Sequence, residues 1–195
     1  MAWGKLGSTT LSSTSDVIDV TSLSNNKYIT LLHHGLYSGD SNGTFNFNDD
    51  TGTKYAQRNN YVGGSDGAST SQTKFSYGDS SVHDSIFATS YILNIAGEEK
   101  LFITYYATVT STGANTPFRT EQVGKWVNTS DAITSIKHTQ SSSGGDYISG
   151  SNVSVLGSDM TPATASELKV QDGLIFYETD TNKEYILYDS TWTEL

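Results

Sequence analysis

The sequence predicts an all-β protein: an antiparallel β-sandwich of the jelly-roll type, followed by a C-terminal β-hairpin appendage. Short segments in which polar and apolar residues alternate recur along the chain, as expected of half-buried strands. Clusters rich in Gly, Ser and Asn, such as SGDSNG and SSSGGD, lie between them and favour turns. No stretch of ten or more residues combines helical periodicity with capping residues. An immunoglobulin-like sandwich is the alternative, although the Cys…Trp…Cys spacing of that fold is absent.

Nine segments carry this alternation and are predicted to be strands. The segments 86–95 and 101–109 form a predicted hairpin through the turn AGEEK, in which Ile92, Phe102 and Tyr106 are expected to face the core. The cluster VGGSDGAST, residues 62–70, is interpreted as a turn. The predicted strands are residues 17–20, 28–37, 44–48, 54–58, 86–95, 101–109, 122–127, 133–137 and 153–156.

We divide the chain into a sandwich body (1–157), a linker (158–171) and an aromatic C-terminal hairpin (172–195). The linker is predicted from the Gly, Pro, Ala and Ser residues of GSDMTPATASELKVQ. In the hairpin, GLIFY and EYILY flank ETDTNK, where Asp180 and Asn182 suit a turn. An isolated hairpin is only marginally stable in water, so its apolar side chains require a covering surface. The predicted assembly interface comprises Ile175, Tyr177, Ile186, Tyr188 and Trp192.

Charge and composition restrict the classes of partner. The formal net charge is -10, which argues against nucleic acid or an anionic membrane, because both require Lys and Arg to meet phosphates. Protein or neutral glycan is the expected partner. The chain has no Cys and therefore no disulfide or thiolate metal site. No window approaches the roughly 20 apolar residues of a membrane span, and no cleaved signal sequence is recognisable at the N-terminus.

The histidines do not form a recognisable catalytic or metal site in the sequence. His33 and His34 are adjacent, and neighbouring residues of a strand point to opposite faces, so the pair cannot ligate one metal ion. His138 is isolated. A catalytic triad of Ser81, His83 and Asp84 has only proximity in its favour, in a chain where Ser is abundant.

The segment NFNDDTG provides a candidate Ca²⁺ site. Asn46, Asn48 and Asp50 are expected on one strand face, where their oxygens could hold the ion. The EF-hand pattern fails, because Thr51 stands where Gly is required and Gln57 where Glu is required. A purely structural interpretation is favoured, in which a strand runs into an Asp-rich turn. Asp49 or Asp50 could then pair with Arg58. No cofactor is predicted.

Two further features of the sequence resemble functional sites. The acidic pair Glu98–Glu99 falls in the predicted AGEEK turn, which favours a solvated surface over a pair of glycosidase carboxylates. Aromatic side chains can stack on sugars, and the chain has Trp3, Trp126 and Trp192 together with 12 Tyr residues. A core position is the more frequent role for aromatic residues on alternating strands. No catalytic residue is predicted.

Four blocks of the sequence together resemble small virion structural proteins of tailed bacteriophages of the marine type. The blocks are AWGKLGSTTL, FNFNDDTGTKYAQR, GKWVNTSDAITSIK and SGSNVSVLGSD, which span the body from Ala2 to about Asp159. GSNVSVLGSD also resembles the closing strand of jelly-roll modules. The tail DGLIFYETDTNKEYILYDSTWTEL is similar to aromatic hairpins at the ends of phage fibre and surface proteins.

The resemblance implies a non-enzymatic component of the virion, assembled in the host cytoplasm, with no catalytic residues to transfer. We expect a capsid decoration or head-fibre protein, or a tail-associated surface protein, that acts by assembly with other virion proteins and as a homo-oligomer. The alternative is a carbohydrate-binding adhesin module that contacts glycans of the host surface through Tyr and Trp.

Overall fold

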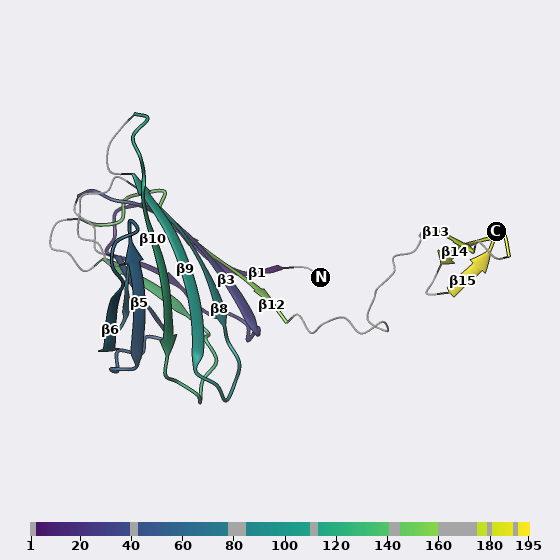
Figure 1. The fold of residues 1–195 in the computed structure, drawn as a ribbon, viewed down its shortest axis with the longest axis horizontal. Helices are drawn as coiled ribbons and strands as arrows, with labels where there is room; N and C mark the ends of the chain where they lie inside the picture. The colour runs from purple at the N-terminus through teal and green to yellow at the C-terminus, as the bar shows by residue number, and fades with distance from the viewer. Residues whose placement is uncertain are drawn as a thin grey trace. The chain divides into compact units, whose positions relative to one another are not determined.

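The computed structural model describes residues 3–39, 43–77, 85–109, 113–140, 145–159, 175–178, 181–188 and 191–195. The chain divides into two compact units, Met1–Asp159 and Met160–Leu195, which we call the body and the tail. The described residues form antiparallel strands and no helix (Figure 1), and hence no helix long and apolar enough to cross a membrane. The predicted all-β class is confirmed.

The strands of the body form two sheets. The large sheet has the order β1-β12-β3-β8-β9-β10-β5-β6, and the small sheet has the order β2-β11-β4-β7, with every neighbouring pair antiparallel. In Figure 1 the strands β3, β8, β9, β10 and β5 run side by side across the large sheet. The bounds are β1 Gly4–Thr10, β2 Val17–Val20, β3 Tyr28–Leu36, β4 Gly43–Phe47, β5 Tyr55–Tyr61, β6 Gly67–Gln72, β7 Phe75–Ser76, β8 Ser85–Leu93, β9 Lys100–Val109, β10 Phe118–Trp126, β11 Ile136–Gln140 and β12 Asn152–Ser158.

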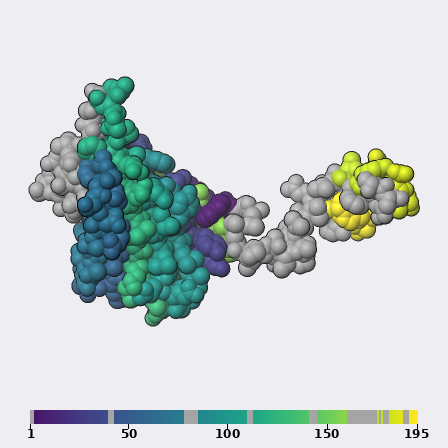
Figure 2. Space-filling model, in the orientation of Figure 1, coloured from purple at the N-terminus to yellow at the C-terminus, as the bar shows by residue number. Residues whose placement is uncertain are grey.

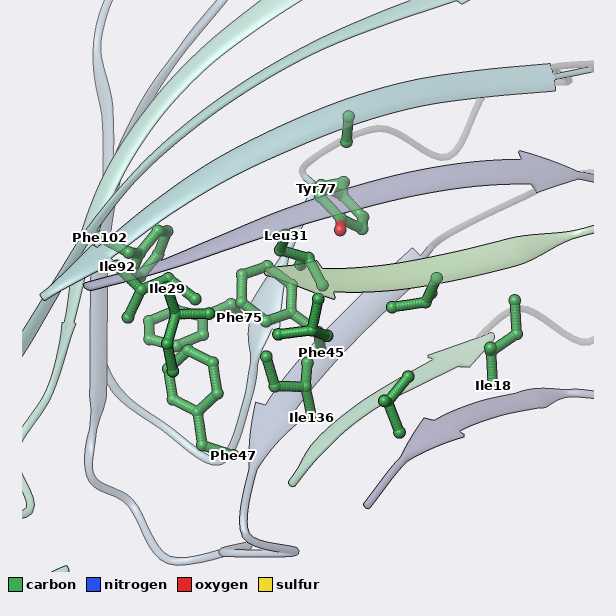
Figure 3. Packing of buried hydrophobic residues seen from close by; sticks show 14 of the residues in the cluster. Ile18, Ile29, Leu31, Phe45, Phe47, Phe75, Tyr77, Ile92, Phe102 and Ile136 are labelled. Carbon is green, nitrogen blue, oxygen red and sulfur yellow. The ribbon is translucent and has the colours of Figure 1, made fainter. Parts of the chain in front are cut away.

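Aromatic rings from both sheets meet in the core of this sandwich. Phe102 of β9 packs edge-on against Phe75 of β7, with ring centroids 4.2 Å apart. Phe45 of β4 lies 5.6 Å from Phe102 and 5.0 Å from Phe75. Trp126 of β10, fully buried, contacts Phe47 of β4. Figure 3 shows these phenylalanines pointing toward one another between the sheets, beside Ile29 and Leu31 of β3.

The period-two pattern predicted the central strands well. The strand predicted at 17–20 is β2, and the predicted hairpin is the pair β8 and β9, joined by a turn in which Gly97 has a φ of 85°. Ile92, Phe102 and Tyr106 face the core with exposed fractions of 3%, 2% and 4%, as expected. These strands are buried on one side, so their composition alternates and can be recognised locally.

The same pattern missed the peripheral strands of the body. β6 lies in and beyond the cluster 62–70 that was interpreted as a turn, and β1 and the two-residue β7 were not predicted. β1 and β6 are the edges of the large sheet and have few buried residues, so their sequences do not alternate. The strand predicted at 133–137 is β11 at Ile136–Gln140, with Ile133 buried just before it.

The tail contains a three-stranded antiparallel sheet in the order β13-β14-β15. β13 (Ile175–Glu178) and β14 (Lys183–Tyr188) correspond to the two strands expected from the sequence, and β15 (Thr191–Glu194) is an additional strand. Asn182, in the turn before β14, has a φ of 55°. Ser158, assigned to the linker, belongs to β12. The rest of the predicted linker from 160 onward, and Asp180, lie outside the described residues.

Gly124 on β10 leaves the space that Phe102 occupies. A Cβ atom at this position would lie 2.2 Å from the Phe102 ring and 2.9 Å from the backbone oxygen of Ala56. We expect Gly124→Ala to lower the free energy of unfolding by about 1–3 kcal/mol, the usual cost of overpacking a core. Urea denaturation measures it. Gly4→Ala is the control, since a Cβ there meets nothing within 4 Å, and equal effects of the two substitutions would contradict the packing argument.

Candidate functional site

Strand β9 is more apolar on its outer side than on its inner side. Its residues alternate strictly between buried and exposed. The buried side includes Lys100, Thr104 and Thr108 beside the aromatic residues of the core, whereas every exposed side chain is apolar. Solvent normally meets the polar side of a half-buried strand, so this inversion makes the outer side of β9 a candidate contact surface. The exposed residues of β9 are Leu101, Ile103, Tyr105, Ala107 and Val109.

Neighbouring strands extend this apolar surface across the large sheet. Tyr91 of β8 and Val123 of β10 both stand opposite Ile103 in the strand register, so the three side chains form a row. Tyr91 is 53% exposed and Ile103 is 45% exposed. Figure 2 shows β5, β10, β9 and β8 forming one broad surface. We call this set the outer apolar face: Phe87, Tyr91, Leu101, Ile103, Tyr105, Val109 and Val123.

The charged side chains around the outer apolar face neutralise one another. Each cation of β5 or β10 on this side lies within 4 Å of a carboxylate, and the three pairs sum to zero charge. An apolar centre with a balanced polar rim is the usual composition of a protein interface. The pairs are Arg58–Asp66 at 3.5 Å, Arg119–Glu121 at 2.7 Å and Lys125–Glu99 at 2.7 Å.

An open hollow of about 190 Å³ lies over β10 within this surface. β10 contributes Val123, β9 contributes Ile103 and Tyr105 on one side, and β5 contributes Arg58 and Asn60 on the other. The hollow therefore has one apolar and one polar side. Its dimensions suit a single large side chain or one ring of a sugar, and not a drug-sized ligand, for which pockets of about 300 Å³ and more are typical.

The tail sheet carries the second exposed apolar surface. Ile175 and Tyr177 share one face because they are two residues apart on β13, and they are 60% and 49% exposed. The register places Ile186 opposite Ile175 on that face, and the 66% exposed Leu195 follows β15. Trp192 stands opposite Leu187, and so belongs to the other face.

Of the predicted interface residues, Ile175, Tyr177 and Ile186 therefore share a face, and Trp192 does not. Tyr188 lies on β14, and its side chain is outside the described residues. A count of residues along the tail could not have placed Trp192, because the face on which it lies depends on how β15 pairs with β14.

Two buried histidines meet between the sheets of the body. His33 of β3 and His138 of β11 have ring centroids 4.3 Å apart, and both side chains are fully buried. His34 is exposed, which confirms the prediction that the adjacent pair points to opposite faces. The Tyr77 hydroxyl lies 3.3 Å from His138 Nδ1. Within the described part of the chain, neither ring nitrogen of His33 has a hydrogen-bond partner.

The interior keeps these imidazoles uncharged. Burial, assisted by the charge of His34, lowers the pKa of His33 to about 3. Burial, assisted by the charge of His33, lowers the pKa of His138 well below its ordinary value. The two rings therefore pack as neutral aromatic groups at pH 7, alongside Tyr77 and Tyr147.

The segment NFNDDTG is a structural turn, and its oxygens are occupied by protein donors. Asn48 has a φ of 53° and is not on β4. Its Oδ1 accepts hydrogen bonds from the backbone of Thr134 and Ser135. Asp50 accepts hydrogen bonds from Gly52 N–H, Trp126 Nε1 and Lys54 Nζ.

The expected Ca²⁺ arrangement of Asn46, Asn48 and Asp50 on one strand face is therefore wrong, since the chain turns after Phe47. Burial raises the pKa of the Asp50 carboxyl, but the three hydrogen bonds outweigh this effect and lower the pKa below its ordinary value. Asp50 pairs with Lys54, Asp49 with Lys137 and Arg58 with Asp66, so the pairing expected for Arg58 is also wrong.

The other residues considered in the sequence are spread over several elements. Trp126 is a core residue, whereas Trp3 and Trp192 are 43% and 41% exposed. Glu98 is exposed in the turn before β9, and Glu99 pairs with Lys125. Among the described residues, no three His, Asp or Glu side chains converge as a metal site would require. Ser81, His83 and Asp84 lie outside the described residues.

The outer apolar face and the histidine pair were not predicted from the sequence. A separate count of the two sides of LFITYYATV would have found the first, because one side reads Leu, Ile, Tyr, Ala and Val. No local signal could have found the second, since His33 and His138 are brought together only by the packing of two sheets.

Comparisons of the chain with protein families, with curated proteins and with solved structures found no match.

Acid should destabilise the body through the histidine pair. An unfolded His has a pKa of about 6.5, so between about pH 6.5 and 3 the unfolded state binds a proton at His33 that the folded state excludes. This effect does not reduce the free energy of unfolding above pH 6.5. Below that pH, the free energy of unfolding falls by about 1.4 kcal/mol per pH unit for each such His.

Between pH 6 and pH 4 the free energy of unfolding should decrease in both chains. We expect the decrease to be about 2–3 kcal/mol smaller in His33→Leu than in the unsubstituted chain, as measured by urea denaturation at each pH. The same pH slope in both chains would show that burial of His33 has no part in acid unfolding.

Proposed function

We propose that this protein is a non-enzymatic structural component of a bacteriophage particle, a capsid decoration or head-fibre protein or a tail-associated surface protein, that acts by assembly. The observation that carries this proposal is the tail: a separate unit whose small sheet exposes Ile175, Tyr177 and Leu195. Exposed apolar patches of this kind mark sites of protein interaction. The location on a phage particle is proposed from the resemblance of the sequence to virion proteins.

The size of the tail sheet supports a role in contact with another chain. Three short strands bury little apolar surface by themselves, and sheets of this size need a packed face for stability. In the tail, Leu187 is buried, while large side chains on the opposite face meet solvent. A virion protein that packs against that face would supply the missing layer.

We further propose that the body is a jelly roll with two inserted strand pairs. In that fold a long antiparallel ribbon is rolled into a sandwich. The pairs β1·β12, β2·β11, β3·β8 and β4·β7 support such a ribbon, since the first half of the body pairs in order with the second. β5–β6 and β9–β10 are then insertions that widen the large sheet.

Removal of the tail should separate folding from assembly. A chain that lacks residues 169–195 retains Asp159, which accepts hydrogen bonds from Asn26 and the backbone of Lys27. We expect its body to unfold at the same temperature as in the full chain, because the body is a unit of its own. We expect its occupancy in purified phage particles, measured by quantitative mass spectrometry, to fall to background.

Point substitutions test which face of the tail is involved. The double variant Ile175→Ser, Tyr177→Ser removes the apolar face and should lower incorporation at least tenfold. Lys183→Ser, at an exposed ion pair with Glu194, is the matched control and should incorporate normally. Full occupancy of the truncated chain would refute the proposed role of the tail.

A further inference from the structure

We infer that the outer apolar face of the body packs against a second copy of the same chain, face to face, about a two-fold axis that runs along β9. The surface is separate from the tail sheet, so this inference goes beyond the proposed function. The occupant is identified by three features of the face: its composition, its shape and its charge.

The composition requires a partner that excludes water. Five positions in succession on the outer side of β9 are apolar, while the inner side accommodates Thr104, which shares a hydrogen bond with Ser90, and a buried lysine, Lys100. Phe87 at 56% and Leu101 at 50% exposure extend the surface on both sides of Ile103. A second sheet laid on this one, at the usual spacing of about 10 Å, would cover all of these side chains.

The outer apolar face has a row of side chains next to a hollow, and a two-fold axis can bring the two together. Tyr91, Ile103 and Val123 lie in one row across β8, β9 and β10, and the hollow lies on the β10 side of that row. When two copies are related by a two-fold axis along β9, strand β8 of each copy lies opposite strand β10 of the other copy. Tyr91 of one copy then enters the hollow over Val123 of its mate, and the reciprocal contact forms by symmetry.

The charge of the face permits two acidic chains to meet. The net charge of -10 makes each copy repel another in most orientations. On the β5 and β10 side of the outer apolar face, three cations are paired with three carboxylates within each copy. This face is therefore a surface on which a second copy can pack without bringing like charges together.

Sedimentation velocity of the full chain over a range of concentrations tests the inference. We expect a dimer in the unsubstituted protein and a monomer for Ile103→Glu, which places two carboxylates at the axis. Truncation of a central aromatic anchor should weaken association, so Tyr91→Ala should raise the dimer Kd at least roughly tenfold. The thermal unfolding of a dilute sample should be unchanged, since both side chains lie outside the core.

Two controls separate this surface from the tail. Tyr177→Glu, at a residue of similar exposure in the tail sheet, should leave the dimer intact while impairing incorporation into particles. Because the chain has no Cys, a single cysteine can be crosslinked without competing sites. A short bismaleimide should join Ile103→Cys chains into dimers, and it should not join Thr70→Cys chains, whose cysteine lies on the peripheral strand β6.

A monomer at every concentration, or a dimer that survives Ile103→Glu and is lost in Tyr177→Glu, would overturn the inference. The main competing occupant is a glycan. If the protein is monomeric and binds immobilised maltohexaose or chitohexaose in a manner that Tyr105→Ala abolishes, the face is a carbohydrate platform and self-association is wrong. Failure of this inference leaves the proposed role of the tail intact, because that role is measured by incorporation into particles.

Discussion

The contact between Phe102 and Phe75 joins the two sheets, and the arrangement of the body depends on it. It brings β9 of the large sheet against β7 of the small one, where Phe45 completes the cluster. The absence of a side chain at Gly124 makes room for the Phe102 ring. Since side chains alternate along a strand, the inward position of Phe102 directs Leu101 and Ile103 outward. One core contact thereby determines which residues the protein presents on its surface.

The body has an unusual distribution of polarity that follows from this register. Its interior contains the neutral pair His33 and His138, the hydrogen-bonded pair Ser90 and Thr104, and the ammonium group of Lys100 held by backbone carbonyls. A buried polar group without a hydrogen-bond partner costs free energy, and among the described residues neither ring nitrogen of His33 has one. Apolar side chains meanwhile occupy the outer side of the large sheet. Burial of that outer side by a partner would recover the stabilisation that the interior of a single chain lacks.

Two apolar surfaces in an otherwise acidic protein suit a component that is built into a larger object. The tail sheet and the outer apolar face belong to separate units, so each can engage a different neighbour. We proposed the first for attachment to the particle and the second for pairing of copies. A negative net charge elsewhere on the chain disfavours unspecific association before assembly.

The sequence by itself determined the all-β class, the hairpin of β8 and β9 and the core positions of Ile92, Phe102 and Tyr106, because the alternation of a half-buried strand is local. It could not reveal the edge strands β1 and β6, whose residues are mostly exposed and do not alternate. Only the tertiary structure brought His33 to His138. Only the tertiary structure showed that the Asp50 carboxylate accepts a hydrogen bond from Trp126 and is not arranged to bind a metal ion. Those contacts join residues far apart in the chain, and they exist because two sheets pack face to face.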